Sequence, residues 1–201
     1  FGEAGRELYN FIWNDFCDWY IEISKVALNG DDEELKTRKQ ENLIWILDQI
    51  LRLLHPIMPF VTEKLWLSMP HDGKSIMVAK YPETHKEFEN KEADSQMAFL
   101  IEVIKAVRNI RMEVNAPMSS PIDIMIQIDD DNNKAVLDNN AEYVENFLHP
   151  KALSVAADIE APKLAKTAVI PGAQIFVPLT ELVNVDEELA KMEKEEKRLE
   201  A

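Results

Sequence analysis

The sequence predicts a mainly α-helical fold that ends in a small α+β module and the start of a coiled-coil helix. Apolar residues recur at three- and four-residue steps over much of residues 1–115, which is helical periodicity. After Pro117 the period changes to two, which is typical of strands. A heptad-like spacing of apolar residues begins at Leu182. We therefore expect a helix bundle over residues 1–115, an α+β module over 116–181 and the start of a coiled coil over 182–201.

Four amphipathic helices make up the expected bundle. Their apolar stripes and breakers place them at about 8–28, 31–55, 59–69 and 92–114. Gly30 is expected to take the left-handed cap conformation after the first helix. Pro56 breaks the second helix, because proline has no amide hydrogen and clashes with the preceding turn.

The aromatic residues of the first helix are predicted to be core residues rather than ligand contacts. Trp13, Phe16 and Trp19 fall at helical spacing, where aromatic side chains usually pack inside. Cys17 is expected to be a small buried hydrophobe. A single cysteine in the chain favours a reducing compartment over a disulfide framework.

The α+β module is predicted from alternating and turn-bounded segments. Ile122, Ile124, Ile126 and Ile128 alternate with Asp123, Met125 and Gln127, and a helix is expected over about 133–148. A second strand is expected near 153–157. Residues 165–170 and 173–178 are expected to pair as a hairpin around Pro171-Gly172.

Composition restricts the function classes. The formal net charge is −15, and neither part is basic: residues 1–115 carry 14 basic against 20 acidic side chains, and 116–201 carry 8 against 17. Charge alone argues against RNA, because phosphate neutralisation supplies much of the affinity of nucleic-acid binders. No apolar run approaches the roughly 18 residues of a membrane span. No leader opens the chain, so we expect a soluble, cytoplasmic protein with no membrane contact.

Four stretches resemble one enzyme family. LYNFIWNDFCDWYIE (Leu8 to Glu22) resembles a helix of the anticodon-binding bundle of the valyl-tRNA synthetases. LHPIMPFVTEKLW (Leu54 to Trp66) resembles a turn shared by the class I valyl, isoleucyl and leucyl enzymes, and VRNIRME (Val107 to Glu113) resembles a helix of the same group. PLTELVNVDEE (Pro178 to Glu188) resembles the entry to the terminal coiled-coil arm of the valyl enzymes.

The resemblance implies a fold and a role. It implies a class I synthetase anticodon-binding bundle from the carboxy-terminal region of a valyl-tRNA synthetase, whose catalytic and editing domains lie outside this chain. The implied partners are the anticodon stem-loop of valine tRNA and those missing domains, in a monomeric parent enzyme. No cofactor is expected in this chain. ATP is implied in the catalytic domain of the parent, which attaches valine to its tRNA.

Three residues are candidate tRNA contacts. The resemblance places the helix of Ile21 on the anticodon-facing surface, and an apolar side chain there could pack on a base. Arg108 and Arg111 lie three apart on one helix face, where guanidinium groups suit phosphate contact. Pairing of these arginines with Glu113 or other acids is the alternative. His55 is expected to be a hydrogen-bonded helix terminator, and the four histidines show no metal-ligand spacing.

Two other functions stay open. One is an isoleucyl- or leucyl-type synthetase, although those isoleucyl enzymes that end in a zinc-binding module would need a cysteine cluster, and this chain has one cysteine. The other is an acidic helical protein-interaction module without an RNA role, which the charge favours and the motifs do not.

Overall fold

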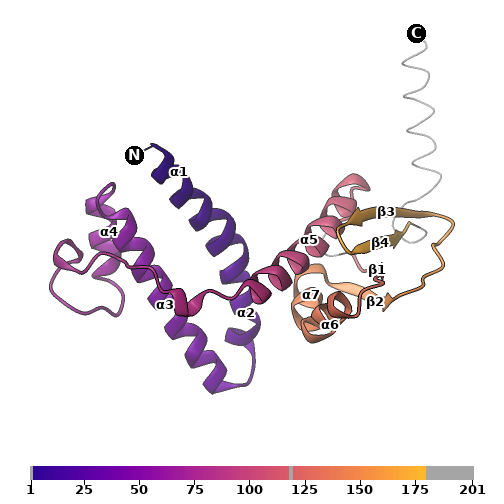
Figure 1. Ribbon diagram of the computed structural model, residues 1–201, viewed down its shortest axis with the longest axis horizontal. Coiled ribbons are helices and arrows are strands. Elements are labelled where there is room, and N and C mark those ends of the chain that lie inside the picture. The colour runs from indigo at the N-terminus through magenta and orange to yellow at the C-terminus, as the bar shows by residue number, and fades with distance from the viewer. Residues whose placement is uncertain (1, 118–119, 180–201) are drawn as a thin grey trace, which may run out of the picture. The chain divides into compact units, whose positions relative to one another are not determined.

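A computed structural model describes residues 2–117 and 120–179 (Figure 1). The chain forms two compact units, Phe1–Glu89 and Asn90–Ala201, and each is described here by itself. The coiled-coil helix predicted over 182–201 lies outside the described residues. Both expected classes of structure are present, since the first unit is helical and the second combines helices with a four-stranded sheet.

The predicted first helix is present, and its middle is unusually wide. α1 (Gly2–Asn10), the π-helix η1 (Phe11–Ile21) and α2 (Glu22–Asn29) form one continuous helix, because the residues at both junctions keep right-handed helical torsions. A π-helix closes i→i+5 hydrogen bonds and so holds more residues per turn than the 3.6 of an α-helix. Side chains four residues apart therefore lie nearly above one another.

Stacked aromatic rings follow this wide geometry. The rings of Tyr9 and Trp13 are 6.4 Å apart with planes at 6°, and those of Phe16 and Tyr20 are 6.1 Å apart at 16°. Phe16 is buried as predicted, but Trp13 is 56% exposed, so the prediction that it packs in the core is wrong for this structure. The buried side continues at four-residue spacing to Ser24, whose hydroxyl donates to the carbonyl of Tyr20 at 2.7 Å.

Gly30 ends this helix without a left-handed cap. Its torsions are φ −76° and ψ 175°, which is extended backbone. The chain leaves the helix by straightening, so the predicted cap conformation is wrong. Asp32 then starts the next helix, because its carboxylate accepts the backbone N–H groups of Glu34 and Leu35 at 3.0 and 2.9 Å.

The second and third predicted helices are confirmed as α3 (Glu33–Leu54) and α4 (Pro59–Trp66). Their shared core centres on Leu51, Trp66 and Ile76. The indole N–H of Trp66 donates to Asp48 at 2.6 Å, and the same carboxylate pairs with Arg52 at 2.9 Å. The loop after α4 includes short 3₁₀ turns, η2 (Ile76–Val78) and η3 (Lys86–Phe88).

The second unit is a sheet covered by helices. The strands are β1 (Ile122–Gln127), β2 (Pro150–Ala156), β3 (Ala165–Ile170) and β4 (Ala173–Pro178), in the order β2-β1-β4-β3. β1 and β2 run parallel, and the other pairs are antiparallel. The parallel pair is joined by a helical crossover, α6 (Asp131–Asn139) and α7 (Ala141–Leu148), where a single helix had been predicted. The break falls at Asn140, which leaves helical torsions at ψ 22°.

The fourth predicted helix, α5 (Lys91–Glu113), packs differently from the expectation. Its predicted stripe is buried, with Leu100, Val103 and Ile110 each at most 3% exposed. The stripe contacts β3, β4, α6 and α7 of its own unit. The unit boundary therefore falls at Glu89/Asn90, before the helix, and not at the change of periodicity after residue 115. An amphipathic stripe predicts that a helix is covered, but it does not identify the covering element.

Candidate nucleic-acid interface

Ile21 lies at the end of the π-helix, next in sequence to a tyrosine whose ring lies near a cation. It is half-buried, and its neighbour Tyr20 has the amino group of Lys39 6.0 Å from its ring centre. Burial raises the pKa of the Tyr20 phenol, so this ring is neutral over the ordinary pH range. This end of the helix therefore carries a partly exposed aliphatic side chain at Ile21, and the adjacent Tyr20 has a lysine near its ring. Sequence reasoning missed Lys39, because its approach to Tyr20 depends on how α3 folds back on α2.

Arg111 is buried, although the sequence suggested a surface contact. It is 1% exposed, and its guanidinium donates to the carbonyls of Pro117 (2.9 Å), Ser120 (2.8 Å) and Leu148 (2.7 Å). Leu148 is the last residue of α7, so the positive charge meets the carbonyl end of that helix. Desolvation lowers the pKa of this guanidinium. In this structure the side chain presents no face to a phosphate, and it joins α5 to α7.

Arg108 lies one turn earlier and also faces α7. It is half-buried, with its guanidinium carbon 5.2 Å from the ring centre of Phe147. The two arginines thus come together on α7, whereas Ile21 belongs to the other unit. Glu113, the alternative partner weighed for the arginines, accepts instead from Lys166 of β3 at 3.1 Å.

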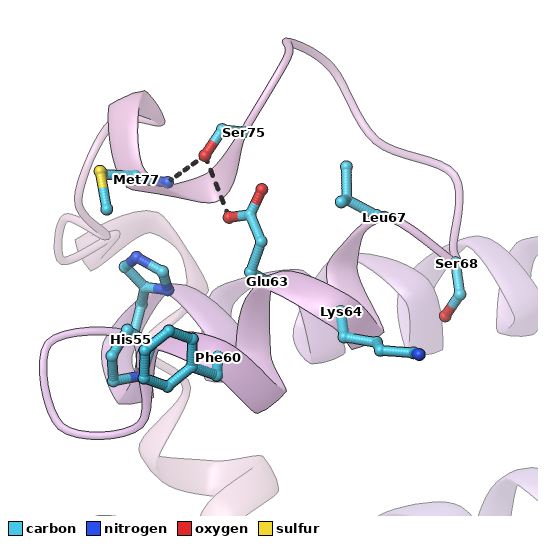
Figure 2. Close-up of a pocket in the computed structure, with 9 residues that line it drawn as sticks. His55, Phe60, Glu63, Lys64, Leu67, Ser68, Ser75 and Met77 are labelled. Atoms are coloured by element: carbon cyan, nitrogen blue, oxygen red, sulfur yellow. Dashed lines mark hydrogen bonds between the residues drawn. The ribbon is translucent and has the colours of Figure 1, made fainter.

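An open groove of about 500 Å³ runs along α4 (Figure 2). Phe60, Glu63, Lys64 and Leu67 lie at steps of three, four and seven residues, which places them on one helix face. The wall opposite includes Ser75 and Met77, and the groove is also lined by His55, Pro59 and Ser68. Phe60 is 91% exposed and Met77 is 73% exposed. The sequence assigned no role to this face.

Four polar side chains that line the groove, those of His55, Glu63, Ser68 and Ser75, have protein partners. Figure 2 shows Glu63 pointing toward Ser75, whose hydroxyl donates to it at 3.0 Å, and the Ile76 N–H donates to the same carboxylate at 3.2 Å. The Thr62 hydroxyl donates to the Met58 carbonyl at 2.9 Å. Its oxygen must therefore accept from Nδ1–H of His55, 2.8 Å away. This confirms His55 as a hydrogen-bonded terminator of α3.

The described part of the chain has neither a metal-binding cluster nor a membrane-spanning helix. Within residues 2–117 and 120–179, no three or more His, Cys, Asp or Glu side chains gather in a way that could hold a metal ion. None of the helices in these ranges has the length and apolar character needed to cross a membrane. Cys17 is a free thiol and is half-buried, where full burial had been expected.

Comparison with known proteins gives one consistent result. The chain is 88% identical to the valine–tRNA ligase of Lactobacillus acidophilus over 94% of its length. It is 58% identical to the valine–tRNA ligase of Latilactobacillus sakei over 95%, and 60% identical to that of Lactiplantibacillus plantarum over 96%. It spans about a fifth of the length of these relatives, 22% in each case.

The family model that matches the chain identifies its class. The model describes the anticodon-binding domain of tRNA ligases, and it matches residues 1–126. That range takes in the continuous first helix, α3, α4, α5 and most of β1. The match covers more than half of the chain and includes the helices that carry Ile21, Arg108 and Arg111. The chain belongs to the family of anticodon-binding domains of tRNA ligases.

Proposed function

We propose that this chain is the anticodon-binding part of a valine–tRNA ligase and that it binds the anticodon stem-loop of valine tRNA. The observation that carries the proposal is the 88% identity, over 94% of the chain, to a protein named valine–tRNA ligase. The alternatives, isoleucyl- and leucyl-type enzymes, have the class I turn motif in common with this chain. The relatives reported above are all valine enzymes.

In this function the chain supplies binding energy and orientation rather than a reacting group. Positioning a substrate lowers the entropic part of a barrier without any proton or bond being moved by the positioning domain. Valine and ATP would react in a catalytic domain outside residues 1–201, and an editing domain would also lie there. Residues 182–201 would begin the coiled-coil arm. A cytoplasmic, monomeric enzyme is the setting that we propose.

The proposed RNA contacts are Ile21 and Arg108, with Lys39 added. Ile21 can pack on a base, because base stacking requires only an apolar face. Lys39 supplies a positive charge 6.0 Å from the ring centre of Tyr20, the residue before Ile21. Arg108 is half-buried, with its guanidinium carbon 5.2 Å from the ring centre of Phe147, and the geometry of a guanidinium suits phosphate contact. For Arg111 we propose a positioning role, because its bonds to Pro117 and Ser120 hold the chain that follows α5, the helix of Arg108, and its bond to Leu148 ties α5 to the end of α7.

The activity is tested by aminoacylation with the whole enzyme that carries this chain, offered each amino acid with its matching tRNA in turn. We expect charging of valine tRNA with valine. Charging of isoleucine or leucine tRNA would support the related enzymes, and absence of charging would support the protein-interaction module.

The contact residues are tested in the same enzyme with Ile21→Ala and Arg108→Ala. Both variants should lower tRNA charging about tenfold or more, since one lost contact of about 1.4 kcal/mol is a tenfold change. Valine-dependent ATP–pyrophosphate exchange should stay unchanged, because it requires no tRNA. Lys105→Ala, an exposed cation on the same helix as Arg108, is the control. Loss of exchange as well would show that the helices have a structural role only.

The chain alone is expected to bind tRNA weakly, because its net charge of −15 repels phosphate. A gel shift with residues 1–201 measures this. Nanomolar, anticodon-dependent binding would contradict the expectation.

A further inference from the structure

We propose that the groove of α4 is a docking site for an apolar segment of the same polypeptide, one that lies outside residues 1–201. This inference rests on the proposed function, in which the chain is part of a longer ligase. The occupant that we infer is a protein surface with aliphatic or aromatic side chains. It is not RNA and not a second copy of this chain.

The first support is the exposed apolar surface of the groove. Phe60, Leu67 and Met77 are 91%, 50% and 73% exposed, and all three line the groove. Ile57 and Met58, on the turn before α4, are 53% and 48% exposed. Single exposed apolar residues are ordinary on protein surfaces, but several on one groove and its approach are typical of an interaction surface.

The second support is that apolar side chains remain on the groove side of α4, although its inner side is already covered. Thr62 and Trp66 lie four residues apart on the inner side, and each is at most 1% exposed. Phe60 and Leu67 lie on the groove side, seven residues apart, beside the charged Glu63 and Lys64. Phe60 and Leu67 are therefore not part of the core that α4 shares with α3, and they stay exposed.

The charges of the groove argue against RNA as the occupant. Phosphate recognition requires cations, and Lys64 is the only Lys or Arg among the residues that line the groove within the described chain. Glu63 adds a negative charge, and its hydrogen bonds to Ser75 and to the Ile76 N–H hold it in place. A protein segment with apolar side chains meets no such repulsion.

The length of the relatives supports the same polypeptide as the source of that segment. The chain spans 22% of each of the three valine–tRNA ligases compared. A segment of the same polypeptide is tethered, so its effective concentration at the groove reaches the millimolar range, on the order of 1 mM for short linkers. A tethered segment can therefore occupy a shallow apolar groove that a free partner would leave empty.

The test is cysteine labelling in two contexts. Phe60→Cys is introduced into residues 1–201 and into the whole enzyme, and modification by a maleimide is followed by mass spectrometry of the peptide that carries residue 60. We expect fast labelling in the isolated chain and labelling at least tenfold slower in the whole enzyme without tRNA. Phe88→Cys is the matched control, because Phe88 is also an exposed aromatic residue of this unit, 67% exposed and outside the groove. It should label at similar rates in both contexts.

Four results would overturn the proposal. The first is equal labelling of Phe60→Cys in the isolated chain and in the whole enzyme, and the second is equal protection of Phe60→Cys and Phe88→Cys. The third is protection of Phe60→Cys that appears only when tRNA is added, which would indicate RNA as the occupant. The fourth is protection that rises with enzyme concentration, which would indicate a second copy. Hydrogen exchange of the unsubstituted proteins gives an independent readout, since the amides of residues 60–67 should exchange more slowly in the whole enzyme.

Failure of the docking proposal and failure of the proposed function give different results. Valine charging by the unsubstituted enzyme measures the function and does not depend on where the groove lies. Labelling measures coverage of the groove and requires no substrate. An enzyme that charges valine tRNA but leaves Phe60→Cys reactive would retain the function and lose the docking site.

Discussion

Replacing Arg111 by methionine should destabilise the second unit strongly. Methionine keeps an unbranched apolar stem of similar reach, so Arg111→Met removes the guanidinium and its hydrogen bonds with little loss of packing. Three carbonyls lose their donor: those of Pro117, Ser120 and Leu148. The chain turns back toward the guanidinium at Asn115, where φ is 52°, and that return would no longer be held.

The magnitude follows from the burial of the three bonds. The bond to the Leu148 carbonyl is buried, and a hydrogen bond from a charged donor contributes about 1.5–3 kcal/mol. The bonds to Pro117 and Ser120 are part-buried, so those carbonyls can regain water, and each loss costs about 0.5–1 kcal/mol. Removing a buried charge returns some desolvation energy. We expect a net loss of about 3 kcal/mol, a large part of the 5–15 kcal/mol typical of a domain.

The assay is native-state hydrogen exchange of the β1 and β4 amides in residues 1–201, which reports the second unit alone. Lys105→Met is the matched control, since it makes the same kind of change on the same helix at a side chain that is 54% exposed. It should alter the free energy of opening by less than about 0.5 kcal/mol. If Arg111→Met changes that free energy by no more than the control does, the carbonyl bonds do not stabilise the unit and our reasoning is wrong.

Three further predictions concern other parts of the chain. Trp66→Ala should lower the free energy of unfolding of the first unit in urea by about 3–5 kcal/mol, because it empties a fully buried site and removes the donor to Asp48. Phe60→Ala is the control, because Phe60 is 91% exposed, and it should cost under about 0.5 kcal/mol. Equal losses would contradict the assigned core. Gly172→Ala should destabilise the second unit by about 2 kcal/mol, because φ is +83° and a Cβ would lie 2.4 Å from Nδ2 of Asn133. Adding Asn133→Ala removes the clash but not the backbone strain, so it should restore only part of the lost stability. Full recovery of stability would show that the backbone carries no strain. Absorbance titration should show a tyrosine with a pKa above 10, absent in Tyr20→Phe, because burial raises the pKa of this phenol. Because the pKa is higher in the folded protein, the contribution of Tyr20 to the free energy of unfolding is fully present below pH 10, the unfolded value. It is lost as the pH rises through the folded pKa. A Tyr20→Phe protein that unfolds at the same alkaline pH as the unsubstituted protein would contradict this.

Local pattern predicted the elements of the fold well, because the signals are local. The period change after Pro117 located β1, and Pro171-Gly172 located the turn between β3 and β4, where Gly172 has positive φ. The start of α3 also falls close to the predicted residue 31, with Asp32 as its cap. The predicted conformation of Gly30 was wrong because a helix can end either with a left-handed glycine or with extended backbone, and the sequence does not distinguish these two endings.

Tertiary placement could not be predicted in the same way. The buried stripe of α5 was identified correctly, but the sheet that covers it is built from residues up to 65 positions further along the chain. Arg111 shows the same limit at one residue, because its acceptor on Leu148 lies 37 positions away. An arginine at a helical position is usually exposed, so only the folded neighbourhood reveals that three carbonyls converge on it.

The π-helix changes the direction in which side chains before it point relative to side chains after it. Each residue of an α-helix turns the side-chain direction by about 100°. The wide turns of η1 turn it by less, so over eleven residues the accumulated angle differs from that of an α-helix of the same sequence. The exposed rings of Tyr9 and Trp13 therefore point in a different direction, relative to the face of α2 that packs on α3, from the one that a helical wheel drawn at 100° per residue would give. Substitutions that favour ordinary α-turns within Phe11–Ile21 would redirect that ring pair without altering a single contact residue.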